Sequence, residues 1–117
     1  METGLDNLMR FQSEALKLRG YRQELIAANI ANADTPQYKA VDIDFAQALK
    51  GAVAGTEGAS TAAPDLLYRN PTQSALDGNT VEMDGERARF ADNTVRYEAA
   101  MRYLSAQIKT MLAAVQG

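Results

Sequence analysis

The C-terminal third of the chain carries the pattern that most restricts its fold. Alternate steps of four and three residues, starting at Phe90, meet an apolar or aromatic side chain at seven of eight positions. This spacing places the side chains along one side of an α-helix. The positions are Phe90, Thr94, Tyr97, Met101, Leu104, Ile108, Met111 and Val115. The segment contains no proline, and Asp84 is a suitable N-cap residue. The sequence therefore predicts a helix within residues 84–117, of roughly 30 residues and about 45 Å in length.

The N-terminal part of the chain predicts a second long helix, within residues 1–35. The same stepping gives a stripe that is apolar at its start and carries amides at its end. Its members are Leu8, Phe11, Ala15, Leu18, Arg22, Leu25, Asn29 and Asn32. Pro36 disfavours the helical conformation at Thr35, so we expect the helix to end near Ala33 or Asp34.

The middle of the chain, residues 36–83, lacks sustained helical spacing. Residues 50–75 are rich in Gly, Ala, Ser and Thr and contain Pro64 and Pro71, which is typical of a flexible connection. Just before this connection, "VDIDF" alternates apolar and acidic residues. We expect it to be extended, with Ile43 opposite a solvated face formed by Asp42 and Asp44. "DLLYRN" and "NTVEM" are short strand candidates on either side of an Asp-Gly turn.

These features predict a mainly α fold that forms one structural domain. We expect the two terminal helices to pair as an elongated antiparallel, coiled-coil-like hairpin, with a flexible middle and short β segments between them. One pair of helices cannot bury both stripes together with flanking residues such as Ile26, Ile30 and Leu112. The leftover apolar surface favours burial against other chains. An ordinary small helical bundle, or a two-helix dimer, explains the spacing equally well.

The composition excludes several kinds of chemistry. The chain has neither cysteine nor histidine, so zinc sites built on those residues, cysteine nucleophiles and histidine-dependent catalysis are ruled out. The formal net charge of −3 disfavours a nucleic-acid ligand, because such proteins present a basic face. No apolar run is long enough to span a membrane, and the first residues do not resemble a cleaved secretory signal. We therefore expect no enzymatic activity, no cofactor or metal, and no small-molecule substrate.

Residues 27–39, "AANIANADTPQYK", contain more polar and helix-breaking residues than the end of a helix requires. Pro36 terminates the helix, and Asn32 suits the exit because asparagine tolerates cap conformations. Asn29 lies a turn earlier, among alanines whose small side chains allow a neighbouring backbone to approach. An amide in such a place can bind a neighbour's main chain and fix the register between helices. We favour this contact over simple capping, which is the alternative.

The same segment resembles the N-terminal signature of the bacterial flagellar rod and hook family, Asn-x-x-Asn-x-x-Thr-Pro-x-Tyr. The matching positions are Asn29, Asn32, Thr35, Pro36 and Tyr38. The resemblance covers residues 5–50 and 76–117. Within the family, "DIDF", "DGNTVEMD" and the short chain are similar to the proximal rod proteins. Gln37 stands where the family often has glycine, which disfavours a tight turn after Pro36.

The resemblance implies a structural subunit of the proximal rod of the flagellar basal body, without catalysis. Members polymerise through their terminal helices into a hollow tube in the periplasmic space, after export through the flagellar type III apparatus without a cleaved signal. Implied partners are further copies, other rod proteins, the rod base adaptor and the export gate. The signature residues and both stripes would be assembly contacts. Another rod or hook-base protein of the family is the alternative, and a small cytosolic helical adaptor or chaperone is a more distant one.

Overall fold

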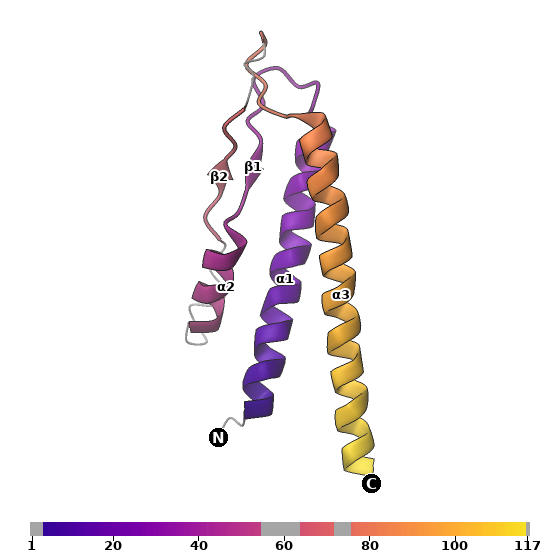
Figure 1. Cartoon of the computed structure of the whole chain (residues 1–117). Coiled ribbons are helices and arrows are strands. Elements are labelled where there is room, and N and C mark those ends of the chain that lie inside the picture. Colours follow the sequence, from indigo (N-terminus) through magenta and orange to yellow (C-terminus); the bar gives the residue numbers. More distant parts are fainter. Residues whose placement is uncertain (1–3, 55–63, 72–75, 117) are drawn as a thin grey trace.

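The computed structural model is elongated and mainly helical, and it describes residues 4–54, 64–71 and 76–116. Its principal extents are 64 × 27 × 18 Å. Figure 1 shows the elements, which in chain order are α1 (Gly4–Ala31), β1 (Val41–Asp42), α2 (Phe45–Ala54), β2 (Leu67–Tyr68) and α3 (Met83–Gln116). The predicted fold class, mainly α with a long helix near each end of the chain, is confirmed.

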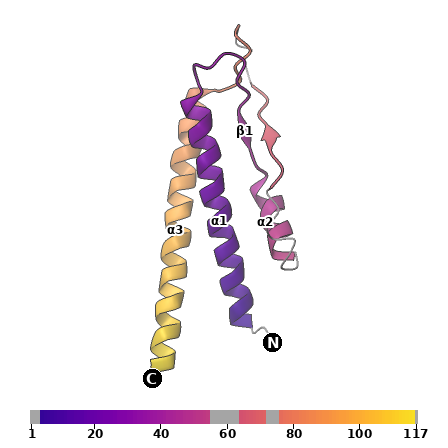
Figure 2. The ribbon, with the colours of Figure 1, turned by 180° about the vertical axis from the view of Figure 1, so that it is seen from behind.

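The two long helices run antiparallel and lie side by side, as Figures 1 and 2 show from opposite directions. Gln23 Nε2 donates a hydrogen bond to Thr94 Oγ1 at 2.7 Å. Asn93 Nδ2 donates to Gln23 Oε1 at 2.7 Å and to the backbone oxygen of Arg19 at 2.9 Å. These bonds set the register of α1 against α3. Toward the two chain ends, the ribbons of α1 and α3 diverge (Figure 1).

The ends of both long helices lie close to their predicted positions. α1 ends at Ala31 and continues into a turn, slightly before the expected end at Ala33 or Asp34. α3 begins at Met83, so Asp84 lies inside its first turn and not at the predicted N-cap position. Its negative charge is still favourable there, near the positive end of the helix dipole. No helix in the described ranges combines the length and the hydropathy that crossing a membrane requires.

β1, α2 and β2 form an arm that folds back beside α1 (Figures 1 and 2). β1 pairs antiparallel with β2, with Val41 opposite Tyr68 and Asp42 opposite Leu67. The extended conformation predicted within "VDIDF" and the strand predicted within "DLLYRN" are therefore confirmed. "NTVEM" is not a strand and leads directly into α3.

α2 is a helix of ten residues whose second half falls where the sequence predicts a flexible connection. It forms because apolar residues recur at helical spacing along its half-buried side. These residues are Phe45, Ala48, Leu49, Ala52 and Val53. Asp44 caps its start, since Gln47 N donates to Asp44 Oδ1 at 3.2 Å. The guanidinium of Arg19 lies 3.6 Å from the centre of the Phe45 ring, which joins α2 to α1.

The interior of the described structure is small, and much of it is polar. The buried apolar residues are Leu18, Ile26, Ala40 and Ile43. The buried polar residues are Asn29, Asp42, Asn79, Glu86 and Asn93. Buried polar groups are stable only when they are paired, so hydrogen bonds and ion pairs must hold these elements together along with apolar contacts.

Candidate functional site

Asn29 is fully buried near the end of α1 and pairs with the backbone of β1. Its Nδ2 donates to Val41 O at 2.8 Å, and Val41 N donates to its Oδ1 at 3.0 Å. Nδ2 also donates to Glu86 Oε2 at 3.1 Å, and the Tyr38 hydroxyl donates to Oδ1 at 3.2 Å. The amide thus uses both of its donors and both of its lone pairs. β1 is bonded on one edge by this side chain and on the other by β2.

Two buried carboxylates, those of Asp42 and Glu86, are joined through Arg69. Asp42 accepts from Arg22 Nε and Nη2 at 2.9 and 3.0 Å, and from Arg69 Nη2 at 2.7 Å. Arg69 Nε donates to Glu86 Oε1, and Arg89 Nη1 lies 3.4 Å from the same oxygen. Buried charges are tolerated when each is paired in this way. We call Arg22, Asn29, Asp42, Arg69 and Glu86 the polar cluster; it joins α1, β1, the residue after β2, and α3.

The ionisation of Asp42 follows from this geometry. Burial alone would raise its pKa, but hydrogen bonds from Arg22 and from Ile43 N, with the charges of Arg22 and Arg69, bring the pKa below the ordinary value of 3.8. The hydrogen bond to Asp42 in turn raises the pKa of Arg22. Both groups are therefore charged at neutral pH.

The prediction that Asp42 lies in solvent is wrong. Its exposed fraction is only 7%, because Arg22 and Arg69, which are 20 and 27 positions away, converge on its carboxylate. Asp44 is exposed as expected. Alternation along one strand shows which residues share a face, but not which distant side chains cover that face.

The turn after α1 is held by Asn79, which comes from the segment before α3. Its Nδ2 lies 3.0, 3.1 and 2.6 Å from the carbonyl oxygens of Asn32, Ala33 and Thr35. These carbonyl groups lie in the turn that follows α1, and those of Asn32 and Thr35 also accept backbone N–H groups at 3.0 and 3.2 Å. Asn79 therefore ties this turn to the segment before α3, more than 40 positions along the chain.

A tight turn follows Pro36, although the sequence disfavours one there. Gln37 has a φ of 65°, in the left-handed region that glycine adopts more easily. Its N–H donates to Asp77 O at 2.8 Å. Gly78, with a φ of 77°, stands in the facing turn. The two turns therefore support each other through the backbone.

Four of the five signature residues make hydrogen bonds inside the subunit. Asn32 Nδ2 donates to Ala28 O at 2.8 Å, and Thr35 Oγ1 donates to Asn32 Oδ1 at 3.1 Å. Tyr38 and Asn29 bind each other. Pro36 is exposed. The backbone that we expected beside Asn29 is present, but it is β1 of the same chain. A role of the signature in contacts between subunits stays a prediction.

Sequence reasoning missed Arg69, Asn79 and Glu86. Asn79 and Glu86 lie in or beside "DGNTVEMD", a segment that pointed only to the family resemblance. Arg69 follows a short strand, and no local spacing marks it as the residue that bridges two buried carboxylates.

The predicted stripe residues differ in burial according to their place along the helices. Leu18 is buried, and Leu25, Tyr97, Leu104 and Met111 are half-buried. More than a third of the surface is exposed in Leu8, Phe11, Phe90, Met101, Ile108 and Val115. Except for Phe90, these exposed residues lie in the halves of α1 and α3 that are nearer to the chain ends, where the two helices diverge (Figure 1).

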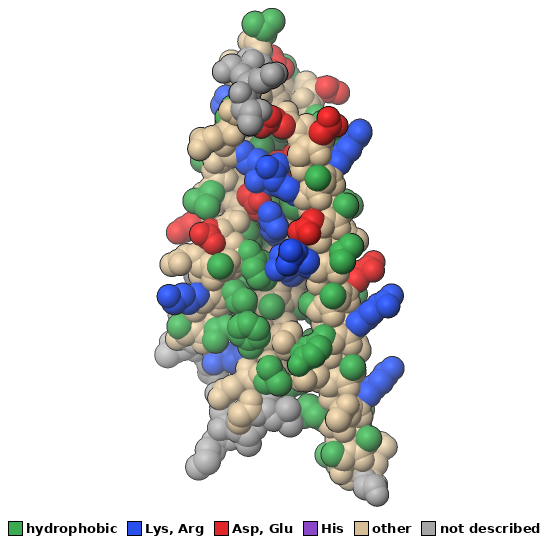
Figure 3. Space-filling model, viewed as in Figure 1, with side chains coloured by type: hydrophobic (Ala, Val, Ile, Leu, Met, Phe, Trp, Pro, Cys, Tyr) green, Lys and Arg blue, Asp and Glu red, His purple; other side chains and the backbone are tan. Residues whose placement is uncertain are grey.

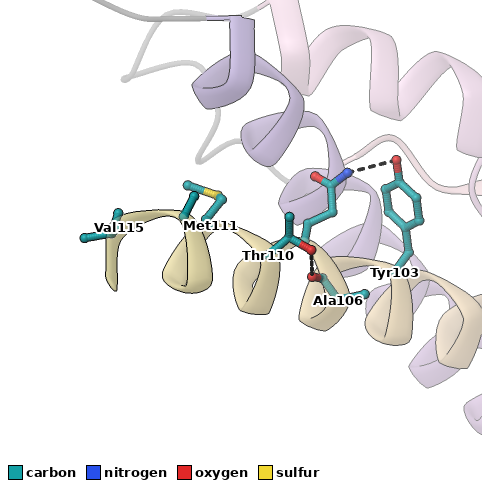
Figure 4. A pocket seen from close by; sticks show the side chains of 7 residues that line it. Tyr103, Ala106, Thr110, Met111 and Val115 are labelled. Atoms are coloured by element: carbon teal, nitrogen blue, oxygen red, sulfur yellow. Dashed lines mark hydrogen bonds between the residues drawn. The ribbon is translucent and has the colours of Figure 1, made fainter. Parts of the chain in front are cut away.

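The C-terminal half of α3 carries an apolar groove of about 550 Å³. It is lined by Tyr103, Ala106, Gln107, Thr110, Met111, Ala114 and Val115. Figure 4 shows Tyr103 and Met111 rising from the same side of the helix. In Figure 3, charged side chains gather in the upper half of the molecule, and hydrophobic ones occupy much of the lower half between the elements. This end of the subunit therefore offers an apolar helix surface.

The polar cluster and the groove of α3 are suited to structural contacts more than to catalysis. The described residues contain no group of three or more acidic side chains that could hold a metal ion. The carboxylates of the polar cluster are paired with arginines. The cluster fixes the arm on the helix pair, and the groove on α3 can receive another apolar surface.

Comparison with known proteins identifies the family. A family model described as "Flagella basal body rod protein" matches residues 9–39, which contain most of α1 and the signature. A protein of Salmonella typhimurium named flagellar basal body rod protein FlgB is 50% identical over 97% of this chain and 96% of its own length. Proteins with the same name from Escherichia coli K12 and Cereibacter sphaeroides are 47% and 41% identical, over at least 95% of both chains. Because the similarity extends over nearly the full length of each protein, this chain belongs to the FlgB family of flagellar basal body rod proteins.

Proposed function

We propose that this chain is a structural subunit of the proximal rod of the bacterial flagellar basal body. The observation that carries the proposal is the similarity to proteins named FlgB over at least 95% of both chains. The role is one of assembly and load bearing. It requires no catalysis and no cofactor.

The exposed stripe residues indicate how such a subunit would polymerise. Met101, Ile108 and Val115 are exposed stripe residues in the half of α3 where the ribbons of α1 and α3 diverge. Apolar surface at helical spacing is stabilised when another helix buries it. We infer that the terminal halves of α1 and α3 pack against helices of adjacent subunits and form the core of a hollow tube.

The polar cluster gives this subunit a defined shape. It binds β1 and the residue after β2 to both long helices, so the arm has one position on the helix pair. A polymer needs subunits of constant shape, because each interface repeats. The signature residues would then act by shaping the end of α1 and the start of the arm.

The partners that we propose are other copies of the chain, other rod proteins, the rod base adaptor and the export gate. Export would proceed through the flagellar type III apparatus without a cleaved signal. The assembled rod would lie in the periplasmic space. Family membership supports these assignments at the level of the basal-body rod.

A deletion strain tests the function. A strain that lacks this protein is complemented with the wild-type chain or with a chain lacking residues 104–117. We expect the wild type to restore swimming and rod-bearing basal bodies, and the truncated chain to restore neither. Normal swimming with the truncated chain would refute the role of α3 in assembly.

A point-variant pair separates loss of the helix from loss of its apolar face. Ile108→Asp places a charge on the exposed stripe, whereas Ser105→Asp places the same charge at an exposed position off the stripe. We expect only the first to prevent rod assembly.

Fractionation of basal bodies locates the wild-type protein within the rod. Its presence at the base of the rod supports the proximal position, and its presence only in the distal rod identifies another rod protein.

A further inference from the structure

Asn93 of α3 is fully buried, yet its side-chain amide is only partly satisfied. Its Nδ2 donates to Gln23 Oε1 at 2.7 Å and to Arg19 O at 2.9 Å. Its Oδ1 is buried as well and has no hydrogen-bond partner among the residues that the structure describes. A backbone oxygen can only accept, so turning the amide over would bring two oxygens together at Arg19. The orientation of Asn93 is therefore fixed, and it leaves an oxygen in an unfavourable place.

Gln23 is the matching amide on α1. Its Nε2 donates to Thr94 Oγ1 at 2.7 Å, so both ends of its side chain bind α3. Thr94 has a further bond, since its Oγ1 donates to Phe90 O within its own helix. We call Gln23 and Asn93 the amide pair. Two apolar side chains of similar size would need no partners at these positions, so the amide pair adds little to stability or lowers it.

The apolar residues around the amide pair repeat every seven positions. On α1, the other described residues at this spacing from Gln23 are all apolar and half-buried. They are Met9, Leu16 and Ile30. On α3, one line at the same spacing is apolar or aromatic throughout. Its members are Phe90, Tyr97, Leu104 and Met111. A slide of α1 along α3 by one heptad exchanges each of these residues for another apolar one, so apolar contacts alone do not select one register.

The amide pair does distinguish the registers. After a slide of one heptad, or about 10 Å, Asn93 would face Leu16 or Ile30 in place of Gln23. Neither apolar side chain can bind an amide, so two polar groups would lose their bonds to the opposite helix. Such a loss makes the wrong register about tenfold to a hundredfold rarer.

The polar cluster marks the same register but depends on more of the chain. Asn29 binds Glu86, one heptad before Asn93 on α3. The cluster also needs β1 and Arg69, so it acts only once the arm is in place. The amide pair lies on the two long helices alone and can select their pairing before the arm docks.

We propose that Gln23 and Asn93 are specificity-determining residues, which restrict α1 and α3 to one antiparallel register at a cost in stability. A polar side chain within an apolar helix seam fixes register in this way in coiled coils. One register gives every subunit the same shape, and a polymer with repeating interfaces needs this constancy. Only this consequence for the polymer rests on the proposed function.

Urea denaturation of the purified chain tests the cost in stability. Gln23→Leu combined with Asn93→Leu replaces both amides by apolar groups of similar size, so we expect an unfolding midpoint at or above that of the wild type. Asn93→Leu alone leaves Gln23 Oε1 without its donor and should unfold at a lower urea concentration than the double variant. A double variant that is less stable than the wild type would show that the amide pair is a stabilising contact, and would overturn the proposal.

Distances between two spin labels test the register. The chain has no cysteine, so Glu24→Cys and Arg102→Cys, at exposed positions of α1 and α3, can carry the labels. Labelled chains are refolded from urea in an excess of unlabelled chain, so that only distances within one molecule are read. We expect one distance when the amide pair is intact. In Gln23→Leu with Asn93→Leu we expect additional distances, from molecules in which one label has moved along the helix axis by about 10 Å.

A matched variant controls for the added apolar surface. Ala31→Leu with Ala91→Leu places two leucines at exposed positions of the same two helices and should keep the single distance. A single, wild-type distance in Gln23→Leu with Asn93→Leu would overturn the proposal.

Rod counts connect the register to assembly. In a strain that lacks the protein, we expect the wild-type chain to restore rods, and Gln23→Leu with Asn93→Leu to give about tenfold fewer rods per cell. Wild-type rod numbers with the double variant would overturn the need for a single register in assembly. Absence of rods with the wild-type chain would overturn the rod function itself, and the distances measured on the purified chain would be unaffected.

Discussion

Asn29 and Val41 exchange two hydrogen bonds, the side-chain amide of one against the backbone of the other, at 2.8 and 3.0 Å. The amide thereby occupies the edge of β1 that β2 leaves open. A strand of two residues has little stability of its own. The position of β1 therefore depends on this side chain of α1 as well as on β2 and on the ion pair between Arg22 and Asp42.

Replacing Asn29 should release β1 from α1. In Asn29→Leu, both backbone groups of Val41 and the carboxylate of Glu86 lose a partner, so we expect the free energy of unfolding to fall by about 3 kcal/mol or more. Urea denaturation followed by circular dichroism measures the loss. Asn7→Leu, at an exposed position of α1, should change it by no more than about 0.5 kcal/mol. Unchanged hydrogen-exchange protection of the Val41 amide in Asn29→Leu would show that β1 does not depend on this pair.

Removing Arg69 should destabilise the subunit through the charges that it leaves behind. Arg69→Met deprives both Asp42 and Glu86 of a buried partner, a change that typically costs about 3–5 kcal/mol. Limited proteolysis should then cut within the arm earlier than in the wild type. Arg102→Met, which alters an exposed arginine of α3, is the matched control. Equal rates of cleavage in the two variants would argue against the role of Arg69.

The pKa of Asp42 predicts how stability depends on pH. Its pKa is lower in the folded chain than its ordinary value of 3.8, through Arg22 and Arg69. The unfolded chain therefore binds the proton more readily, and the contribution of Asp42 is complete above pH 3.8 and is lost as the pH falls below it. Stability measured from pH 7 to pH 3 should decline less in Asp42→Asn than in the wild type. Asp44→Asn is the control, since it preserves a cap residue, and its stability should depend on pH as in the wild type. If the stability of Asp42→Asn also declines as in the wild type, another group causes the loss of stability in acid.

The left-handed backbone conformation of Gln37 predicts that glycine is tolerated at this position. A left-handed conformation costs a residue with a side chain about 1–2 kcal/mol, and glycine avoids this cost while adding about 0.5–1 kcal/mol of chain entropy to the unfolded state. Gln37→Gly should therefore leave the free energy of unfolding unchanged or slightly higher. Gln47→Gly, inside α2, should lower it by about 1 kcal/mol. Similar losses in both variants would mean that Gln37 makes side-chain contacts that offset its strained backbone.

The long helices could be predicted from the sequence because their evidence is local and repeated. The stripe from Phe90 to Val115 and the stop at Pro36 each depend only on neighbouring residues. The sequence also indicated that Asn29 has a role beyond ending the helix. It could not identify the hydrogen-bond partner of Asn29, because Val41 reaches Asn29 only after the chain has turned back on itself.

α2 and the polar cluster were missed for different physical reasons. The apolar spacing of α2 is regular, but Gly51 and the following small residues hid it within a segment of flexible composition. The cluster has no local pattern at all. Arg22, Asp42 and Arg69 lie in three separate parts of the chain, and each could equally lie in solvent until the other two are placed.

The unequal bonding of the two ends of the subunit has a mechanical consequence. Where the polar cluster lies, α1, α3 and the arm are cross-linked by short charge-assisted bonds and will resist bending as one body. Toward the chain ends the two helices diverge, and each will flex separately until a neighbour covers it. The stiffness of a shaft built from such subunits would therefore arise in its terminal helices only on polymerisation, whereas the arm would be stiff from the moment the chain folds.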